Sequence, residues 1–338
     1  MKKIVRKAII TYLAENNLLP VNQHGFLQGP SKLSQFINQV ETIIRVLESD
    51  NDIDSIYLDF SKEFDKVNHA ILCNKFKEKR IGGLVGAWLH NFLSNRTQQV
   101  SANGAISEPT PVLSGVPQGT VLGTNVIMIC DLGLDLTAAF ISMFADDSWV
   151  SSAATSENEQ AHFQHELDDA IYPWTQANKA VFNGYKFEHV HFGKICETVP
   201  IYLDPNGTPI DNKTNNEDLG VIISNDLSWN NQIDLVIASC RKQTAWILKT
   251  FTSCDILTMR TLWISLFRPI IDYCSPLWSP KPTNYGQIDK LKGVLCSFSK
   301  NVDSLRELPY CDRLQSLSLH SIKQRHERYI ILYYTFIE

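Results

Sequence analysis

Three aspartates of this 338-residue chain occupy positions from which they could hold a pair of metal ions. Asp59 ends the apolar-rich stretch 53–60, which predicts a buried strand, and Asp146 and Asp147 lie between two short strand patterns, 140–144 and 148–152. A strand-end carboxylate beside a hairpin that carries two more can hold two Mg²⁺ ions about 3.5–4 Å apart, as phosphoryl transfer requires. Taken alone, an Asp-Asp pair is more often a solvated turn, so the surrounding sequence has to decide.

The segments around these acids resemble the catalytic motifs of LINE-type reverse transcriptases, the polymerases of non-LTR retrotransposons. Residues 58–67 are similar to the family's first motif, 114–123 to its second and 144–147 to its third, in the family's order. The resemblance covers nearly the whole chain, because further stretches match outside the palm motifs. These are 22–26 (start of the fingers motif), Asn183 and Lys186 (fourth palm motif), 218–221 (primer-grip hairpin) and 227–229, 268–270 and 275–278 (helical region).

The resemblance implies a right-hand polymerase, with an α/β palm and fingers followed by an all-α thumb-like region. The expected fingers are 1–50 and 70–118, the palm 51–69 and 119–225, and the helical thumb and C-terminal region 226–338. The residue pattern agrees, because strand patterns such as 186–192 and 219–223 give way to helical patterns at 230–250, 255–268, 285–300 and 312–335. A boundary near 225 is therefore expected.

By resemblance, Asp59, Asp146 and Asp147 hold two Mg²⁺ ions, with Asp59 and Asp146 as the direct ligands expected first. Gln118 is expected to contact the incoming nucleotide. Gly115 and Gly119 are expected to let the backbone approach it closely, since they have no Cβ.

Two further residues have an ordinary interpretation beside the functional one. Phe64, five positions after Asp59, matches the steric gate that excludes a 2′-hydroxyl, and is otherwise a core phenylalanine. Lys186 matches a residue that would protonate the leaving pyrophosphate, and is otherwise a surface lysine. His69 and the other eight histidines are interpreted as structural or solvated.

The implied activity is RNA-directed DNA synthesis, with an RNA template, a DNA primer and deoxynucleoside triphosphates as partners. No apolar run reaches the roughly 18 residues of a membrane span. The eight cysteines are scattered without a Cys-x-x-Cys pair, which favours reduced thiols in an intracellular protein over a zinc site. The net charge of −5 counts against a strong free-standing nucleic-acid binder, although a basic groove can lie on an acidic body.

The sequence departs from the family's pattern near the nucleotide. Where the family's fingers motif has two arginines, this chain has Leu27 and Pro30, and neither can grip a phosphate. The stretch after Gly123 is about two residues short, which would rotate a helix by roughly 200° and must change the local packing. Glu63 replaces a usual alanine and adds a negative charge beside the acids.

These departures leave retention of activity open. The intact acids favour a working nucleotidyltransferase. The missing arginines, the shortening and the net charge favour a catalytically inactive RNA-binding or scaffolding remnant, and a poorly folding pseudogene product is a third interpretation. Because the chain shows no endonuclease region and no Cys/His knuckle, we expect a fragment or a domesticated remnant of a retrotransposon protein.

Overall fold

The chain forms two compact units, Met1–Thr214 and Asn215–Glu338. The computed structural model describes residues 2–25, 31–61, 65–116, 124–145, 147–194, 199–252, 254–281 and 283–337. The division lies before the predicted boundary near 225, because the hairpin of β10 (Asn215–Asp218) and β11 (Val221–Ser224) belongs to the helical unit. Strand β11 packs on α8 (Asn230–Thr250), where Gln232 Oε1 accepts a 2.9 Å hydrogen bond from the Ile222 amide.

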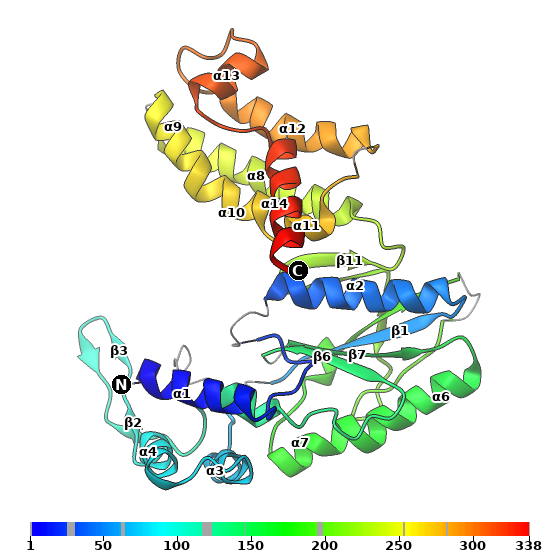
Figure 1. The fold of residues 1–338 in the computed structure, drawn as a ribbon. Coiled ribbons are helices and arrows are strands. Elements are labelled where there is room, and N and C mark those ends of the chain that lie inside the picture. The colour runs from blue at the N-terminus through cyan, green and yellow to red at the C-terminus, as the bar shows by residue number, and fades with distance from the viewer. Residues whose placement is uncertain are drawn as a thin grey trace. The chain divides into compact units, whose positions relative to one another are not determined.

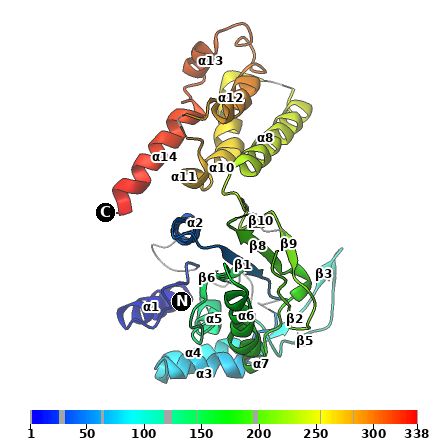
Figure 2. The ribbon, with the colours of Figure 1, turned by 90° about the vertical axis from the view of Figure 1, so that its right-hand side faces the viewer.

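A five-stranded sheet in the order β6-β7-β1-β8-β9 organises the first unit. All neighbouring strands are antiparallel except β8 and β9. Helix α2 covers one face of the sheet, and the run α6–η1–α7 covers the other (Figures 1 and 2). The bounds are α2 (Lys32–Glu48), β1 (Ile53–Leu58), β6 (Phe140–Phe144), β7 (Asp147–Ala153), α6 (Glu157–Glu166), η1 (Leu167–Ile171), α7 (Tyr172–Asn178), β8 (Glu188–Phe192) and β9 (Asp211–Lys213).

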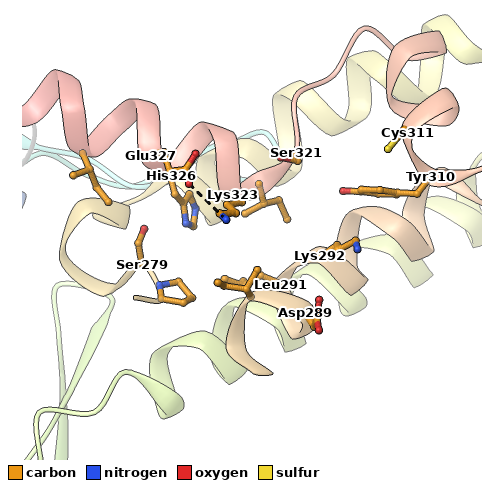
Figure 3. A pocket seen from close by; sticks show the side chains of 14 residues that line it. Ser279, Asp289, Leu291, Lys292, Tyr310, Cys311, Ser321, Lys323, His326 and Glu327 are labelled. Atoms are coloured by element: carbon orange, nitrogen blue, oxygen red, sulfur yellow. Dashed lines mark ion pairs between the residues drawn. The ribbon is translucent and has the colours of Figure 1, made fainter. Parts of the chain in front are cut away.

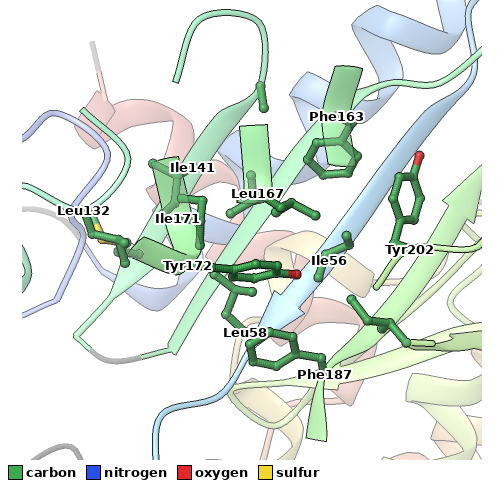
Figure 4. Packing of buried hydrophobic residues seen from close by; sticks show 14 of the residues in the cluster. Ile56, Leu58, Leu132, Ile141, Phe163, Leu167, Ile171, Tyr172, Phe187 and Tyr202 are labelled. Atoms are coloured by element: carbon green, nitrogen blue, oxygen red, sulfur yellow. The ribbon is translucent and has the colours of Figure 1, made fainter. Parts of the chain in front are cut away.

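Strand β1 is buried along its whole length because both of its faces are covered. Its alternate side chains Ile56 and Leu58 join a core cluster with Phe163, Leu167 and Tyr172 of the α6–η1–α7 run (Figure 4). Burial of a large apolar side chain contributes about 1.5–3 kcal/mol, so this cluster fixes the end of β1 on the rigid sheet. The buried strand predicted at 53–60 is confirmed over 53–58.

A helical run follows the acidic hairpin and contains a widened turn. The π turn η1 (Leu167–Ile171) lies immediately before α7, whose second residue is Pro173. Proline has no N–H to donate to the preceding turn, which accounts for a widened turn at this place.

A second hydrophobic cluster of the first unit gathers the remaining helices. These helices are α1 (Lys2–Glu15), α3 (His69–Glu78), α4 (Gly83–Leu93) and α5 (Thr124–Ile129). Two small two-stranded sheets lie between α4 and α5: β2 (Thr97–Gln98) pairs with β5 (Thr110–Pro111), and β3 (Ser101–Ala102) pairs with β4 (Ala105–Ile106). Asn103 and Gly104 form the turn between β3 and β4, with φ of 51° and 80°. Helix α2, which lies in the range expected for the fingers, packs on the five-stranded sheet.

The second unit is a helical assembly that follows the β10–β11 hairpin. Its bounds are α8 (Asn230–Thr250), α9 (Ile256–Leu262), η3 (Trp263–Phe267), α10 (Arg268–Asp272), α11 (Ser275–Trp278), α12 (Tyr285–Ser299), α13 (Tyr310–Ser316) and α14 (Ile322–Ile337). The single helix predicted over 312–335 is wrong. Ser318 adopts φ 49° between α13 and α14, and Ser321 and Gln324 cap the new helix start with reciprocal hydrogen bonds. No helix within the described ranges is long and apolar enough to span a bilayer.

Candidate active site

Asp59 lies one residue beyond β1, held by the backbone of a neighbouring segment. Its carbonyl accepts a 2.8 Å hydrogen bond from the Asn183 amide, and the Ser61 amide donates to the Val181 carbonyl at 2.8 Å. The bridge between Phe60 and Phe182 continues this pairing, with ring centroids 4.6 Å apart. The segment 181–183, whose Asn183 matched the fourth palm motif, therefore fixes the backbone that carries Asp59.

The predicted acidic hairpin is confirmed. Strands β6 and β7 pair Phe144 with Asp147, and Ala145 in the turn has φ 62°. Because Leu58 pairs with Ser148, one step further along both strands brings the ends at Asp59 and Asp147 side by side, where opposed residues have Cα atoms about 4.5–5.5 Å apart. Asp147 is exposed.

Four of the predicted site residues lie outside the described residues: Phe64, Gln118, Gly119 and Asp146. The same holds for Glu63 and for the substituted fingers positions Leu27 and Pro30. No group of three His, Cys, Asp or Glu side chains that could hold a metal occurs among the residues the structure describes. The predicted triad includes Asp146, so this finding does not bear on it.

Residues 22–25 form a brace on the acidic hairpin that was not predicted from the sequence. Residues 22–25 run beside β6, where Gln23 forms an isolated parallel bridge with Met143 and the His24 amide donates to the Met143 carbonyl at 2.8 Å. The buried Gln23 side chain then reaches the turn: its Oε1 accepts from the Ala145 amide at 3.0 Å and from the Gly25 amide at 2.6 Å. The match of 22–26 to a family motif was a signal that this segment matters, but it did not indicate the contact.

Gly25 is required for this close approach. A Cβ at this position would collide with the Ala145 nitrogen and lie 3.0 Å from the Phe144 carbonyl carbon. Both neighbours are backbone, which cannot swing aside as a flexible side chain can. The brace therefore depends on a glycine and a glutamine two residues apart.

Lys186 is brought to Asp59 as the motif match suggested. It lies at the end of the 3₁₀ turn η2 (Gly184–Lys186), before β8 rather than within the strand predicted over 186–192. Its Nζ is 3.4 Å from Asp59 Oδ2, and both side chains are partly exposed. Asp59 Oδ2 itself is buried and has no hydrogen bond of proper geometry within the described part of the chain. Lys186 is therefore close enough to balance its charge without satisfying the oxygen.

Gly115 lies in the part of the second motif that the structure describes, residues 114–116. Two side chains contact its carbonyl oxygen. His69 Nε2 lies 2.8 Å from the carbonyl oxygen, and Arg96 Nη2 donates to it at 2.6 Å. Gly115 has φ 81°, and its amide donates to the Val67 carbonyl at 2.8 Å. The start of the second motif is thus hydrogen-bonded to the end of the first. His69, interpreted as structural or solvated, contacts the Gly115 carbonyl.

The stretch after Gly123 packs through a buried lysine. Lys75 Nζ donates to the Met128 carbonyl at 2.5 Å and to Asp131 Oδ1 at 2.6 Å, and Trp174 Nε1 donates to the same oxygen at 3.0 Å. Met128 packs in the cluster of α3 and α4, whereas Ile129 packs in the sheet cluster. The shortened stretch therefore passes directly from one core to the other, with Asp131 as its polar anchor.

A buried polar network lies at the start of β1, away from the end that precedes Asp59. His189 Nε2 and His191 Nδ1 are each 2.8 Å from Asp54 Oδ1, and the Tyr202 hydroxyl donates to Oδ2 at 2.6 Å. Burial raises the pKa of Asp54, but the hydrogen bonds from the two histidines and the tyrosine outweigh it and leave that pKa below its usual range. The bond to Asp54 raises the pKa of His191, against the opposing effect of burial.

Comparisons with known proteins agree with this arrangement. Residues 1–223 match the family described as reverse transcriptase (RNA-dependent DNA polymerase). Among curated proteins, the chain is 22% identical over 98% of its length to a probable RNA-directed DNA polymerase from transposon BS of Drosophila melanogaster. It is 24% identical over 82% of its length to the one from transposon X-element. The chain covers only 38% and 31% of these relatives.

Among solved structures, telomerase from Candida albicans, in complex with a fragment of telomeric RNA, matches with a TM-score of 0.52 at 10% identity. The match covers 94% of this chain and 59% of that one. At this identity the likeness concerns the fold alone.

Proposed function

Because the chain belongs to the reverse transcriptase family, we propose that it carries out RNA-templated DNA synthesis by nucleotidyl transfer. Its right-hand polymerase fold and its LINE-type relationship, both expected from the sequence, are confirmed. The proposed partners are an RNA template, a DNA primer and deoxynucleoside triphosphates. The chain spans less than two fifths of its transposon relatives, so the activity of a whole transposon protein is not assigned to it.

The proposed reaction joins the primer 3′-oxygen to the α-phosphorus of the incoming nucleotide and breaks the bond from that phosphorus to the bridging oxygen of pyrophosphate. Asp59, Asp146 and Asp147 would hold two Mg²⁺ ions. When bound, such ions would stabilise the negative charge on the attacking and leaving oxygens. The rest of the rate enhancement in such reactions comes from positioning.

The observation that carries the proposal is the pairing of Leu58 with Ser148, because one further step along both strands places Asp59 beside Asp147. The donor set suits Mg²⁺, since carboxylate oxygens are its preferred protein ligands and Asp59 Oδ2 is a buried oxygen without a hydrogen bond in the described residues. An ordinary strand-end acid would instead have that oxygen in water or hydrogen-bonded.

The other predicted residues receive roles from the same arrangement. Lys186 Nζ, beside Asp59, is proposed to donate the proton that the leaving pyrophosphate takes up. Gly115 is proposed to give the nucleotide close access to the backbone, with its carbonyl turned toward Arg96 and His69. Gln118, Gly119 and Phe64 keep the roles implied by resemblance, namely nucleotide contact, close backbone approach and exclusion of a 2′-hydroxyl.

Extension of a DNA primer on an RNA template tests the proposal. Asp59→Asn keeps the size of the side chain but removes the charge that a metal requires. We expect extension to fall at least about a hundredfold, because metal-borne charge stabilisation is worth several kcal/mol. Asp135→Asn, an exposed acid of the same unit, is the matched control and should extend like wild type. Equal activity in wild type and Asp59→Asn would refute the assignment.

A second interpretation is an inactive RNA-binding or scaffolding protein. It is favoured by Leu27 and Pro30, which stand where the family has arginines, and by the net charge of −5. It predicts binding of template and primer without extension. If the missing arginines are the main defect, Leu27→Arg with Pro30→Arg should lower the KM for nucleotide by about tenfold or more, since one charge-assisted contact to phosphate is worth about 1.5–3 kcal/mol. Binding that persists without extension in both chains would favour the scaffold.

A further inference from the structure

A strongly basic cavity lies in the helical unit, between α10 and α14. Its volume is about 460 Å³, and three arginines, one from α10 and two from α14, line it. They are joined by other side chains able to donate hydrogen bonds. The lining residues that matter are Arg268, Arg325, Arg328, His320, Gln324 and Tyr329.

One of the three arginines is neutralised within the protein. Both Arg325 Nε and Nη2 donate to the Asp272 carboxylate, and Nη2 is also 3.0 Å from the Tyr329 hydroxyl. Neither Arg268 nor Arg328 forms an ion pair with any carboxylate of the described residues. Three guanidinium groups thus face one carboxylate, and the cavity keeps two uncompensated positive charges.

Arg268 is the clearest sign that a ligand is expected. Its Nε is buried and has no hydrogen-bond partner among the described residues, and the same is true of Arg260 Nε one helix earlier. A buried donor without a partner costs about 1–3 kcal/mol, more when charged. Burial, and after it the charge of Arg325, lowers the pKa of Arg268. The guanidinium stays protonated, so a bound anion would relieve both costs.

Charge is segregated between the two units of the chain. Residues 215–338 contain 14 Lys and Arg against 12 Asp and Glu, whereas residues 1–214 contain 17 against 24. The acidic balance of the whole chain therefore resides in the first unit. The helical unit is slightly basic, and three of its arginines line this cavity.

The cavity differs from a second one in the same unit, shown in Figure 3. That cavity, about 370 Å³ between α12, α13 and α14, is lined by apolar groups such as Leu291. Its Lys323 is paired with Glu327 at 3.9 Å. Compensated charge and apolar walls give no preference for an anion, so the basic character is specific to the α10–α14 cavity.

We propose that the α10–α14 cavity binds a backbone phosphate of the nucleic-acid strand, with Arg268 and Arg328 as the phosphate-gripping residues. Arginine matches the geometry of phosphate oxygens with two parallel donors, and contacts to backbone phosphate hold a strand without reading its sequence. Arg325 acts as a positioning residue, because its bonds to Asp272 fix α14 against α10. The inference rests on the proposed function, since that function supplies the strand.

The test measures binding of the full chain to a fluorescently labelled RNA–DNA hybrid by anisotropy at several salt concentrations. Arg328→Gln and Arg268→Gln each remove one charge; Arg328 is exposed, so its replacement leaves the fold intact even if Arg268→Gln does not. Arg306→Gln, an exposed arginine of the same unit outside the cavity, is the matched control. Urea unfolding of every variant reports its stability.

Each cavity variant should bind the hybrid about tenfold more weakly, as expected for one lost charge-assisted contact. The slope of log K against log[salt] should become shallower by about 0.7–0.9 per lost phosphate contact. The control should match wild type in both quantities. Slopes equal to wild type in Arg328→Gln and in a folded Arg268→Gln would overturn the proposal.

Two further measurements separate the alternatives. If the variants lose stabilisation by pyrophosphate at matched ionic strength but keep the wild-type slope for the hybrid, the cavity takes a free anion and the strand proposal is wrong. Failure of the proposed polymerase has a different signature. Wild type that binds the hybrid with the expected slope differences but never extends the primer supports the cavity and contradicts the proposed activity.

Discussion

Replacing Gly25 with alanine should impair catalysis without touching an acidic residue. The added Cβ would collide with the Ala145 nitrogen and sit 2.9 Å from Gln23 Oε1, the oxygen that accepts hydrogen bonds from both neighbouring amides. Because Ala145 has φ 62° and is almost fully buried, the turn cannot simply relax into solvent. Residues 22–25 and the hairpin that carries Asp147 must then separate, which displaces Asp147 relative to Asp59.

The size of the effect follows from the contact distances. An ordinary Cβ contact begins near 3.4 Å, so the two segments must separate by on the order of 1 Å, a displacement that can cost a hundredfold in rate. Overpacking of this kind also destabilises a fold by about 1–3 kcal/mol. We expect kcat for primer extension to fall about a hundredfold, while the KM for nucleotide changes by less than about tenfold.

Steady-state extension on an RNA template gives kcat and KM, and urea unfolding gives the stability of the same preparations. Gly82→Ala is the matched control, since nothing lies within 4 Å of a Cβ at that position. Amide exchange offers a readout independent of activity: the Ala145 amide should exchange faster in Gly25→Ala than in wild type. A Gly25→Ala protein with wild-type kcat and unchanged Ala145 exchange would refute the brace.

Three other predictions concern contacts away from this turn. His69→Ala should retain measurable extension, because a second donor still holds the carbonyl that His69 contacts; complete loss in a folded variant would contradict this. Lys75→Met should destabilise the fold by about 2–3 kcal/mol in urea unfolding, and Asp131→Leu in the same chain should recover part of that loss, since an unpaired partner costs more than an absent pair. The Asp54–His191 pair should make stability depend on pH at both ends. The contribution of Asp54, whose pKa is lowered, is lost as pH falls below about 4, and that of His191, whose pKa is raised, is lost as pH rises through its folded value above about 6.5. Asp54→Asn should flatten this profile.

The sequence by itself determined the elements that carry the acids. A run of apolar residues ending in Asp59 and two short strand patterns around Asp147 required a strand end and a hairpin, and the structure has both. These features are local, because the side-chain period of two and the turn chemistry are set by neighbouring residues. The family relationship was also contained in the sequence, since motif order and spacing do not depend on coordinates.

The sequence did not predict where one helix breaks or which partner another helix packs against. The break between α13 and α14 arises at Ser318, which adopts a left-handed backbone within an otherwise helical pattern. For helix α2 the sequence did not indicate its partner, which is the five-stranded sheet. A helical period tells which face is buried, but not which partner buries it.

Only the tertiary structure decided how distant residues serve the site. Gln23 contacts Ala145 across 122 positions, and Lys186 contacts Asp59 across 127. The cavity arginines Arg268 and Arg328 come from separate helices. No local pattern encodes such pairs, because they form only when buried apolar faces fix the elements against one another. The sequence determines the chemical groups of each residue, whereas tertiary packing determines which distant residues those groups contact.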